Sequence, residues 1–467
     1  MTDRNVKLLV IGAGPGGYVC AIKAAKSGVE TLVVEEFKAG GTCLNVGCIP
    51  SKAMIHAADE FSKATSYTSD NELGISVAQP QIDLRATVDW KNGIVSRLNG
   101  GVEGLLKRAG ADTLQGKARF LDGKTVEVVS DGGDITKIHA ENIVIATGSE
   151  PVEIPSLPFG DRIMSSTEVL ALTEVPGSLA VVGGGYIGLE IGTAFAKLGS
   201  QVLVVESADS ILPQYDSALT APVAKRLSQL NVEVMTNARA QRFVNEEFGN
   251  DGLEILLNDG STRNLAVDKV LVTVGRRPRT DCGIGELSLT MDGAYIEIDN
   301  KCQTSMRGVY AIGDITGEPM LAHRAMAQGE VVAGVIAGDG SVFDKQCIPA
   351  VCFTDPEIVT AGITSQEAAK LAIEVSVGQF PLQANGRAMT MERDDGFVRV
   401  VARKDNGVVL GIQAVGYQVS ELSAAFTLAI EMGARAEDIA STVHAHPTVS
   451  EGFQEACMSV LGSALHG

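Results

Sequence analysis

The stretch that decides the fold is GGTCLNVGCIPSK, residues 40–52. It places Cys43 and Cys48 with four residues between them, just downstream of a GAGPGG loop at residues 12–17. This spacing is wider than the Cys-x-x-Cys of thioredoxin-type motifs. No second cysteine pair follows with zinc-site spacing, so we expect no metal. A redox-active disulfide beside a dinucleotide loop indicates electron exchange between thiols and a flavin or a nicotinamide.

The residues after the cysteine pair predict a helix. Pro50 is favoured in a first helical turn, and the run at residues 53–58 has helix-forming character. The positive end of this helix would lie at Cys48, where it lowers the pKa of the thiol and favours the thiolate. Lys52 comes four residues after Cys48 and therefore shares its helix face.

The chain contains one dinucleotide-binding pattern twice. In each copy a strand leads into Gly-x-Gly-x-x-Gly, then a helical run, then a strand that ends in glutamate. The first copy runs from Gly12 to Glu35 and the second from Gly183 to Glu206. One such loop is weak evidence, but two in this context strongly indicate dinucleotide sites. The expected loop contacts are Gly12, Gly14, Gly17, Gly183, Gly185 and Gly188.

The glutamate that ends each copy indicates which dinucleotide the site can bind. Backbone N–H groups at a glycine loop bind pyrophosphate, while Glu35 and Glu206 can accept ribose hydroxyls and repel a 2′-phosphate. No arginine occurs at residues 207–211, so the second site should take NAD rather than NADP. The first site should hold the flavin, because the cysteine pair lies in that half. Further cofactor contacts are expected from Thr42, Thr147, Gly148 and Gly275.

The tail HAHPTVSE, residues 444–451, offers a base for thiol exchange. Thiolate is the nucleophile, and a free thiol has a pKa of about 8.5. Histidine is the side chain suited to take this proton near neutral pH, and His446 is the candidate. Glu451 would orient the ring and stabilise its protonated form. We expect the neighbouring His444 to be structural.

Composition excludes several classes of protein. A net charge of −19 argues against nucleic-acid binding and repels anionic membrane surfaces. No run of 18 apolar residues is present, and the N-terminus leads directly into a strand at residues 7–11, so we expect neither a membrane span nor a signal peptide. The six cysteines outside the pair are scattered, as expected for free thiols in a reducing cytoplasm.

Three segments, residues 41–52, 304–314 and 444–451, resemble the dihydrolipoamide dehydrogenases. These are flavin disulfide oxidoreductases, the family that also includes glutathione reductase and mercuric reductase. The resemblance covers essentially the whole chain and implies FAD and NAD as cofactors. It also implies a homodimer that oxidises dihydrolipoyl groups. The implied partners are the lipoyl domains of a 2-oxo acid dehydrogenase or glycine cleavage complex.

The resemblance assigns roles to individual residues. Cys48 becomes the charge-transfer thiol beside the flavin, and Cys43 the interchange thiol that meets the substrate. The family pairs a lysine and a glutamate at positions matching Lys52 and Glu190, where the lysine stabilises negative charge on the reduced flavin. Asp314 would bind the ribityl chain of FAD.

The resemblance implies one further role, and one departure from its pattern suggests another. The tail histidine, His446 here, serves the disulfide of the other subunit, which makes the dimer necessary for catalysis. Tyr186, inside the second glycine loop, suggests a ring that gates the nicotinamide pocket. Tyrosine is common there in glutathione reductases, whereas many dihydrolipoamide dehydrogenases have an aliphatic residue.

The expected fold class is α/β, with two Rossmann-like dinucleotide-binding domains and a C-terminal α+β dimerisation domain. After about residue 347 the pattern changes to strands 397–402 and 409–414 with helices 365–371 and 420–432. The expected segments are an FAD-binding domain at 1–150, an NAD-binding domain at 151–276, a segment at 277–346 that returns to the FAD domain, and the dimerisation domain at 347–467.

Other assignments remain open at this point. A glutathione-type reductase normally uses NADPH and would carry arginines near Ser207. Mercuric reductase would carry a terminal cysteine pair, and this tail has only Cys457. A non-catalytic flavoprotein scaffold would be isolated without cofactor and without diaphorase activity.

Overall fold

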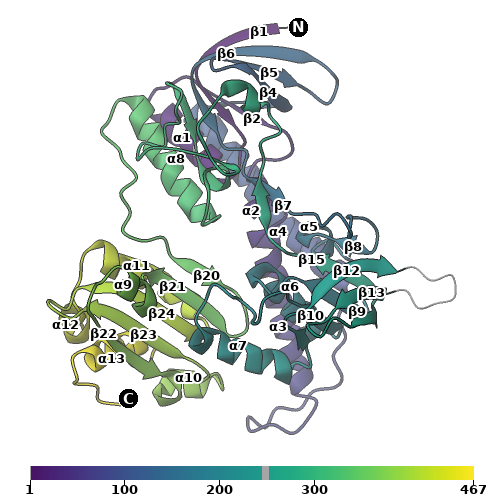
Figure 1. The fold of residues 1–467 in the computed structure, drawn as a ribbon, viewed down its shortest axis with the longest axis vertical. Coiled ribbons are helices and arrows are strands. Elements are labelled where there is room, and N and C mark those ends of the chain that lie inside the picture. Colours follow the sequence, from purple (N-terminus) through teal and green to yellow (C-terminus); the bar gives the residue numbers. More distant parts are fainter. Residues whose placement is uncertain (1, 245–251, 467) are drawn as a thin grey trace. The chain divides into compact units, whose positions relative to one another are not determined.

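The computed structural model describes residues 2–244 and 252–466, which divide into two compact units. One unit comprises Met1–Glu174 and Val272–Asp344, and the other Val175–Leu271 and Lys345–Gly467. The chain therefore leaves the first unit, returns to it and leaves again, as the colours of Figure 1 let the reader follow. The bounds expected for the four functional segments stay a prediction.

The first unit contains a large, mostly parallel sheet. The strands of this unit are β1 (Thr2–Ile11), β2 (Thr31–Glu35), β3 (Asp112–Gln115), β4 (Lys117–Asp122), β5 (Thr125–Val129), β6 (Ile135–Ile145), β7 (Ser149–Pro151), β8 (Ile163–Met164), β16 (Arg276–Pro278), β17 (Met291–Asp292), β18 (Tyr295–Ile296) and β19 (Val309–Ala311). The main sheet has the order β3-β2-β1-β6-β5-β4. β19 pairs in parallel with β6, so the expected returning strand is present.

The first unit also contains several helices. The helices are α1 (Pro15–Lys26), α2 (Gly41–Asn45), α3 (Cys48–Ser66), α4 (Leu84–Ala109), α5 (Ser166–Val169) and α8 (Ala322–Ala337), with 3-10 helices η1 (Ile284–Leu287) and η2 (Gly313–Thr316). Alternate residues of β1 belong to two different hydrophobic clusters, because successive side chains of a strand point to opposite faces of the sheet. Leu8 and Val10 join the cluster containing residues of α1 and α8, while Leu9 and Ile11 join the other.

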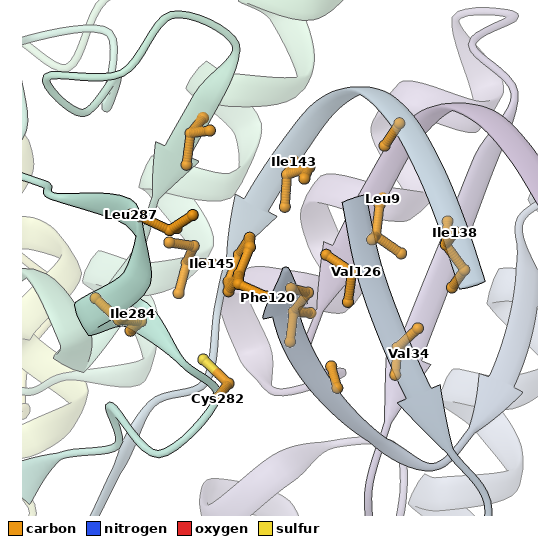
Figure 2. Close-up of a cluster of buried hydrophobic side chains, with 14 of the residues drawn as sticks. Leu9, Val34, Phe120, Val126, Ile138, Ile143, Ile145, Cys282, Ile284 and Leu287 are labelled. Atoms are coloured by element: carbon orange, nitrogen blue, oxygen red, sulfur yellow. The ribbon is translucent and has the colours of Figure 1, made fainter. Parts of the chain in front are cut away.

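Figure 2 shows the second of these clusters. Leu9 and Ile145 of the sheet lie among Phe120, Val126 and other buried side chains. The returning segment supplies Ile284 to the same cluster. Burial of side chains from distant parts of the sequence fixes the returning segment in the first unit.

The second unit repeats the dinucleotide fold and adds an antiparallel sheet. Its first part contains β9 (Ser178–Val182), α6 (Tyr186–Lys197), β10 (Gln201–Val205), α7 (Ser217–Gln229), β11 (Glu233–Met235), β12 (Arg239–Val244), β13 (Gly252–Leu256), β14 (Thr262–Ala266) and β15 (Lys269–Val272). β10 lies between β9 and β11 and pairs in parallel with both. β12, β13 and β14 form an antiparallel sheet.

The last part of the chain has the expected α+β character. It contains β20 (Ala350–Cys352), β21 (Glu357–Gly362), α9 (Ser365–Lys370), β22 (Val375–Pro381), η3 (Leu382–Ala384), α10 (Gly386–Thr390), β23 (Phe397–Arg403), β24 (Val409–Gly416), η4 (Val419–Leu422), α11 (Ser423–Glu431), α12 (Ala436–Ser441) and α13 (Glu451–Val460). The antiparallel sheet has the order β20-β21-β24-β23-β22. Helices α11 and α13 contribute Phe426 and Phe453 to its core.

Candidate active site

The two cysteines lie on consecutive short elements. Cys43 is on α2, and Cys48 is the first residue of α3, as the helix signal after the pair predicts. Their side chains are hydrogen-bonded to each other. This hydrogen bond, burial and negative charge on Cys48 together raise the pKa of Cys43, while the charge of Lys52 lowers it. Lys52 therefore lies close enough to act on the pair electrostatically.

The first glycine loop holds α2 in place. Gly41 has φ +59°, and a Cβ there would lie 2.6 Å from the Cα of Gly14. The neighbouring Gly40 donates its N–H to the carbonyl of Ala13 at 2.8 Å. Only glycine permits this approach. The cysteine pair is consequently fixed against the loop that begins the first dinucleotide fold.

Two asparagines that sequence reasoning missed support the same loop. Asn45 Nδ2 donates to the carbonyls of Gly41 at 2.9 Å and Ala39 at 3.1 Å. Asn99, on α4, donates to Asn45 Oδ1 at 3.0 Å and to the Ala39 carbonyl at 2.5 Å. Asn45 lies within the cysteine motif, so its position in the sequence could have marked it as a candidate site residue. Asn99 is 54 residues away and carries no local signal.

Both glycine loops contact their glutamate in the same way. Glu35 Oε2 accepts the N–H of Ala13 at 2.7 Å, and its Oε1 accepts that of Phe37 at 2.9 Å. Glu206 Oε2 accepts the N–H of Gly184 at 2.6 Å, and its Oε1 accepts that of Ala208 at 2.7 Å. The internal repeat thus extends to individual hydrogen bonds. A carboxylate has about four acceptor positions, which leaves each glutamate able to accept ribose hydroxyls.

The helix that follows each loop begins without a side-chain cap. Gly14 precedes α1 and Gly185 precedes α6, and neither helix has a side-chain hydrogen bond at its N-cap. The first N–H groups of an α-helix lack intrahelical partners, and a pyrophosphate suits them. Gly17 and Gly188 each lie within the first turn of their helix. The residues at both loops therefore fit a dinucleotide.

The strand ends expected to contact the flavin form a connected network in the first unit. Thr147 Oγ1 donates to the carbonyl of Arg279 at 2.7 Å, and Gly148 O accepts the N–H of Arg279 at 3.0 Å. Asp314 Oδ2 accepts the hydroxyl of Ser149 at 2.6 Å. Arg276 Nε donates to the same hydroxyl at 2.8 Å.

Ser149 and Arg276 were missed by sequence reasoning, although each directly follows an expected contact residue. Gly148 and Gly275 precede them, and Gly275 itself belongs to the first compact unit. The remaining expected residue of this region, Thr42, lies on α2 beside Cys43, where its carbonyl accepts the N–H of Val46 at 3.0 Å.

The histidine and glutamate of the tail are paired as expected from their spacing. His446 Nδ1 lies 2.9 Å from Glu451 Oε1, at the start of α13, and the His446 side chain is 79% exposed. Burial alone would raise the pKa of Glu451. Hydrogen bonds from the Thr448 N–H and His446, with the charges of His446 and His444, lower it overall. Glu451 therefore stays ionised and can orient the exposed imidazole.

Glu190 and Tyr186 lie on α6 in the second unit. Glu190 is buried, and its Oε1 accepts the N–H of Phe353 at 2.9 Å. Tyr186 is the first residue of α6 and lies near Tyr215. Lys52 belongs to the first unit, so its pairing with Glu190 stays a prediction, as does the gate formed by Tyr186.

Five of the six cysteines outside the pair are buried, namely Cys20, Cys282, Cys302, Cys352 and Cys457. Burial raises the pKa of Cys282 to about 11 and that of Cys20, Cys302 and Cys457 to about 12. Thiols with pKa values this high are almost entirely protonated at neutral pH and are therefore poor nucleophiles. Within residues 2–244 and 252–466, no cluster of three or more histidine, cysteine or acidic side chains could hold a metal. No helix in these ranges is long and apolar enough to cross a membrane.

Comparison with known proteins identifies the class to which this arrangement belongs. The family model described as pyridine nucleotide-disulphide oxidoreductase matches residues 6–329, and the dimerisation domain of that family matches residues 348–457. The chain therefore belongs to the pyridine nucleotide-disulphide oxidoreductases. The dimerisation domain also supports the expected homodimer.

Two curated relatives within this family carry the same name. The dihydrolipoyl dehydrogenase of Pseudomonas aeruginosa is 54% identical, with 99% of each chain covered. That of Geobacillus stearothermophilus is 45% identical over 99% of this chain and 97% of its own. Among solved structures, LpdA from Mycobacterium tuberculosis has a TM-score of 0.88 at 27% identity, covering 97% of this chain and 99% of its own. The family and fold class expected from the sequence are thus confirmed.

Proposed function

We propose that this chain is an NAD-dependent dihydrolipoyl dehydrogenase, the activity for which its curated relatives are named. The observation that carries the proposal is the hydrogen-bonded Cys43–Cys48 pair, fixed against the first glycine loop. Members of this family use FAD and NAD. FAD belongs to the segment 1–150 with its return at 277–346, NAD to 151–276, and subunit contact to 347–467.

Each cofactor has a set of residues that would hold it. For FAD these are Gly12, Gly14, Gly17, Glu35, Thr42, Lys52, Thr147, Gly148 and Asp314. For NAD they are Gly183, Gly185, Tyr186, Gly188, Glu206 and Gly275. When bound, FAD supplies the two-electron carrier between the cysteine pair and NAD.

The chain's own residues carry out the thiol chemistry. His446, held by ionised Glu451, removes the proton from a dihydrolipoyl thiol. The thiolate attacks the Sγ of Cys43 in the oxidised pair, and Cys48 leaves as a thiolate. The second lipoyl sulfur then attacks the lipoyl sulfur of the mixed disulfide and releases Cys43, which takes the proton of that second thiol. The substrate ends as a disulfide, Cys43 as a thiol and Cys48 as a thiolate, and His446 holds the other proton, which balances two electrons and two protons.

Lys52 stabilises the negative charge that develops beside the pair. Its charge already acts on Cys43. We assign Glu190 the role of orienting Lys52 in the assembled site. The protein substrate is the lipoyl domain of a 2-oxo acid dehydrogenase or glycine cleavage complex, and the enzyme works in the cytoplasm.

Steady-state rates with two substrates and two coenzymes test this function. The purified protein should reduce NAD with dihydrolipoamide, and NADP should replace NAD poorly because Glu206 repels its 2′-phosphate. Preference for NADPH with glutathione disulfide would instead identify a glutathione-type reductase. Isolation without flavin and without diaphorase activity would identify a scaffold.

A further inference from the structure

A short segment of the C-terminal part of the chain is bound to helix α6 by a hydrogen bond and an ion pair. The segment comprises residues 352–355 and begins at the last residue of β20, and both the segment and α6 lie in the second compact unit. Near the start of α6, Glu190 Oε1 accepts the N–H of Phe353 at 2.9 Å. At the end of the same helix, Lys197 Nζ lies 2.5 Å from Asp355 Oδ2. We call residues 352–355 the strap.

Asp355 anchors the strap through an unusual concentration of positive charge. Besides Lys197, Arg226 lies 3.0 Å from Asp355 Oδ2, and Arg393 contacts Oδ1. Asp355 and Lys197 have side chains only 8% and 6% exposed. Burial alone would raise the pKa of Asp355, but the three cations lower it overall. A buried carboxylate so paired holds its position, because moving it would leave several charges uncompensated.

Two further contacts make the strap rigid. Cys352 Sγ donates to the hydroxyl of Tyr215 at 3.2 Å. Thr354 Oγ1 donates to the carbonyl of Pro356 at 2.7 Å, and Thr354 is itself buried. The N–H of Phe353 therefore lies between two fixed neighbours, and its direction is set by the strap rather than by Glu190.

We infer that the strap positions the Glu190 carboxylate for the reaction, with the Phe353 N–H as the direct contact and Asp355 as the anchor. A buried carboxylate needs hydrogen-bond donors, and a backbone N–H on a rigid segment gives it one fixed direction. The expectation that disturbing Glu190 lowers activity rests on its proposed role in orienting Lys52. Phe353 and Asp355 are thus positioning residues that contact neither substrate nor cofactor.

A substitution of the donor separates this role from general stability. Phe353→Pro removes the N–H, while the matched control Phe353→Ala shortens the side chain and keeps it. Glu190→Asp keeps the charge but withdraws the carboxylate by one carbon. If the strap acts through Glu190, then Phe353→Pro and Glu190→Asp should each lower dihydrolipoamide-dependent turnover roughly 10-fold, as expected for a hydrogen bond to a charged group. The double variant should lose little more than either single one.

A spectroscopic readout accompanies the rates. In the two-electron-reduced holoenzyme, the long-wavelength absorbance of the Cys48 thiolate beside FAD should weaken in Phe353→Pro and Glu190→Asp, and Phe353→Ala should retain it. A purely structural role would lower the melting temperature without weakening this absorbance. Losses of turnover that multiply fully in the double variant would overturn the inference. So would a Phe353→Pro enzyme with unchanged absorbance.

A second variant tests the anchor if the proline substitution prevents folding. The pair Asp355→Asn with Lys197→Met removes one charge of each sign, so the net charge of the cluster is unchanged. It should weaken the absorbance in the same direction as Glu190→Asp, and wild-type absorbance would overturn the anchor. Failure of the proposed function is distinguishable, because the wild-type holoenzyme would then show the absorbance but not reduce NAD with dihydrolipoamide.

Discussion

At the scale of single residues, function depends on carboxylates whose surroundings set their task. Glu35 and Glu206 accept backbone N–H groups of their own loops and keep capacity for a ribose. Glu451 is ionised beside an exposed histidine. Burial and hydrogen-bond partners, more than residue type, separate the carboxylates proposed to bind a cofactor from the one proposed to orient a base.

His446→Gln should reduce dihydrolipoamide oxidation by about 10²–10⁴-fold, the usual contribution of a positioned base. NADH oxidation by a dye should change little, because that route bypasses the thiols. Glu451→Gln should show a smaller loss of the same kind, since it orients the ring without accepting the substrate proton. Parallel assays of both reactions check this, and equal losses in the two reactions would exclude His446 as the base.

At the scale of elements, the cysteine pair depends on how closely α2 approaches the first glycine loop. Gly41→Ala would place a Cβ 2.6 Å from Gly14 in a left-handed backbone conformation. Such strain costs about 1–3 kcal/mol, so FAD should bind roughly 5- to 150-fold more weakly.

Gly74→Ala is the matched control for this prediction. Gly74 also has a positive φ, of +69°, but no atom lies within 4 Å of its added Cβ. It should bind FAD like the unmodified protein. Equal FAD dissociation constants for Gly41→Ala and Gly74→Ala, measured by flavin fluorescence, would show that the close approach does not matter.

The elements with local sequence signals were predictable, and the contacts between distant segments were not. Both glycine loops, the helix at Cys48 and strands β23 and β24 follow from spacing and periodicity. Phe353 contacts Glu190 across 163 residues, and Arg226 contacts Asp355 across 129. Such contacts depend on how the parts fold together, for which a single sequence carries no periodic signal.

At the scale of the whole molecule, the stability of the second unit should depend on acid pH through Asp355. Its folded pKa is lowered, so the stabilisation is present above the unfolded pKa of about 3.9 and lost as pH falls through the folded pKa. Asp355→Asn should cost about 3–5 kcal/mol at pH 7 and remove this part of the acid dependence. Urea unfolding of both proteins between neutral and acid pH measures the free energy of unfolding. Parallel pH profiles for the two proteins would contradict the role given to Asp355.

The homodimer offers a complementation test of a shared site. If His446 serves the partner's cysteine pair, a heterodimer of His446→Gln and Cys43→Ser chains contains one intact site, because each interface is used twice under two-fold symmetry. Co-expressed, separately tagged chains should recover about half of the wild-type activity per dimer. Recovery no greater than that of the parent homodimers would place the histidine and the disulfide in the same subunit.

The most direct test of the central claim, that electrons pass from dihydrolipoyl thiols through Cys43 and Cys48 to NAD, is a comparison of Cys48→Ser with the unmodified holoenzyme. FAD content and NADH-to-dye activity should be retained, since the residues proposed to hold FAD, the first glycine loop with Glu35 and Asp314, are unchanged. Reduction of NAD by dihydrolipoamide should be abolished. A Cys48→Ser enzyme that still reduces NAD with dihydrolipoamide at the normal rate would contradict the account.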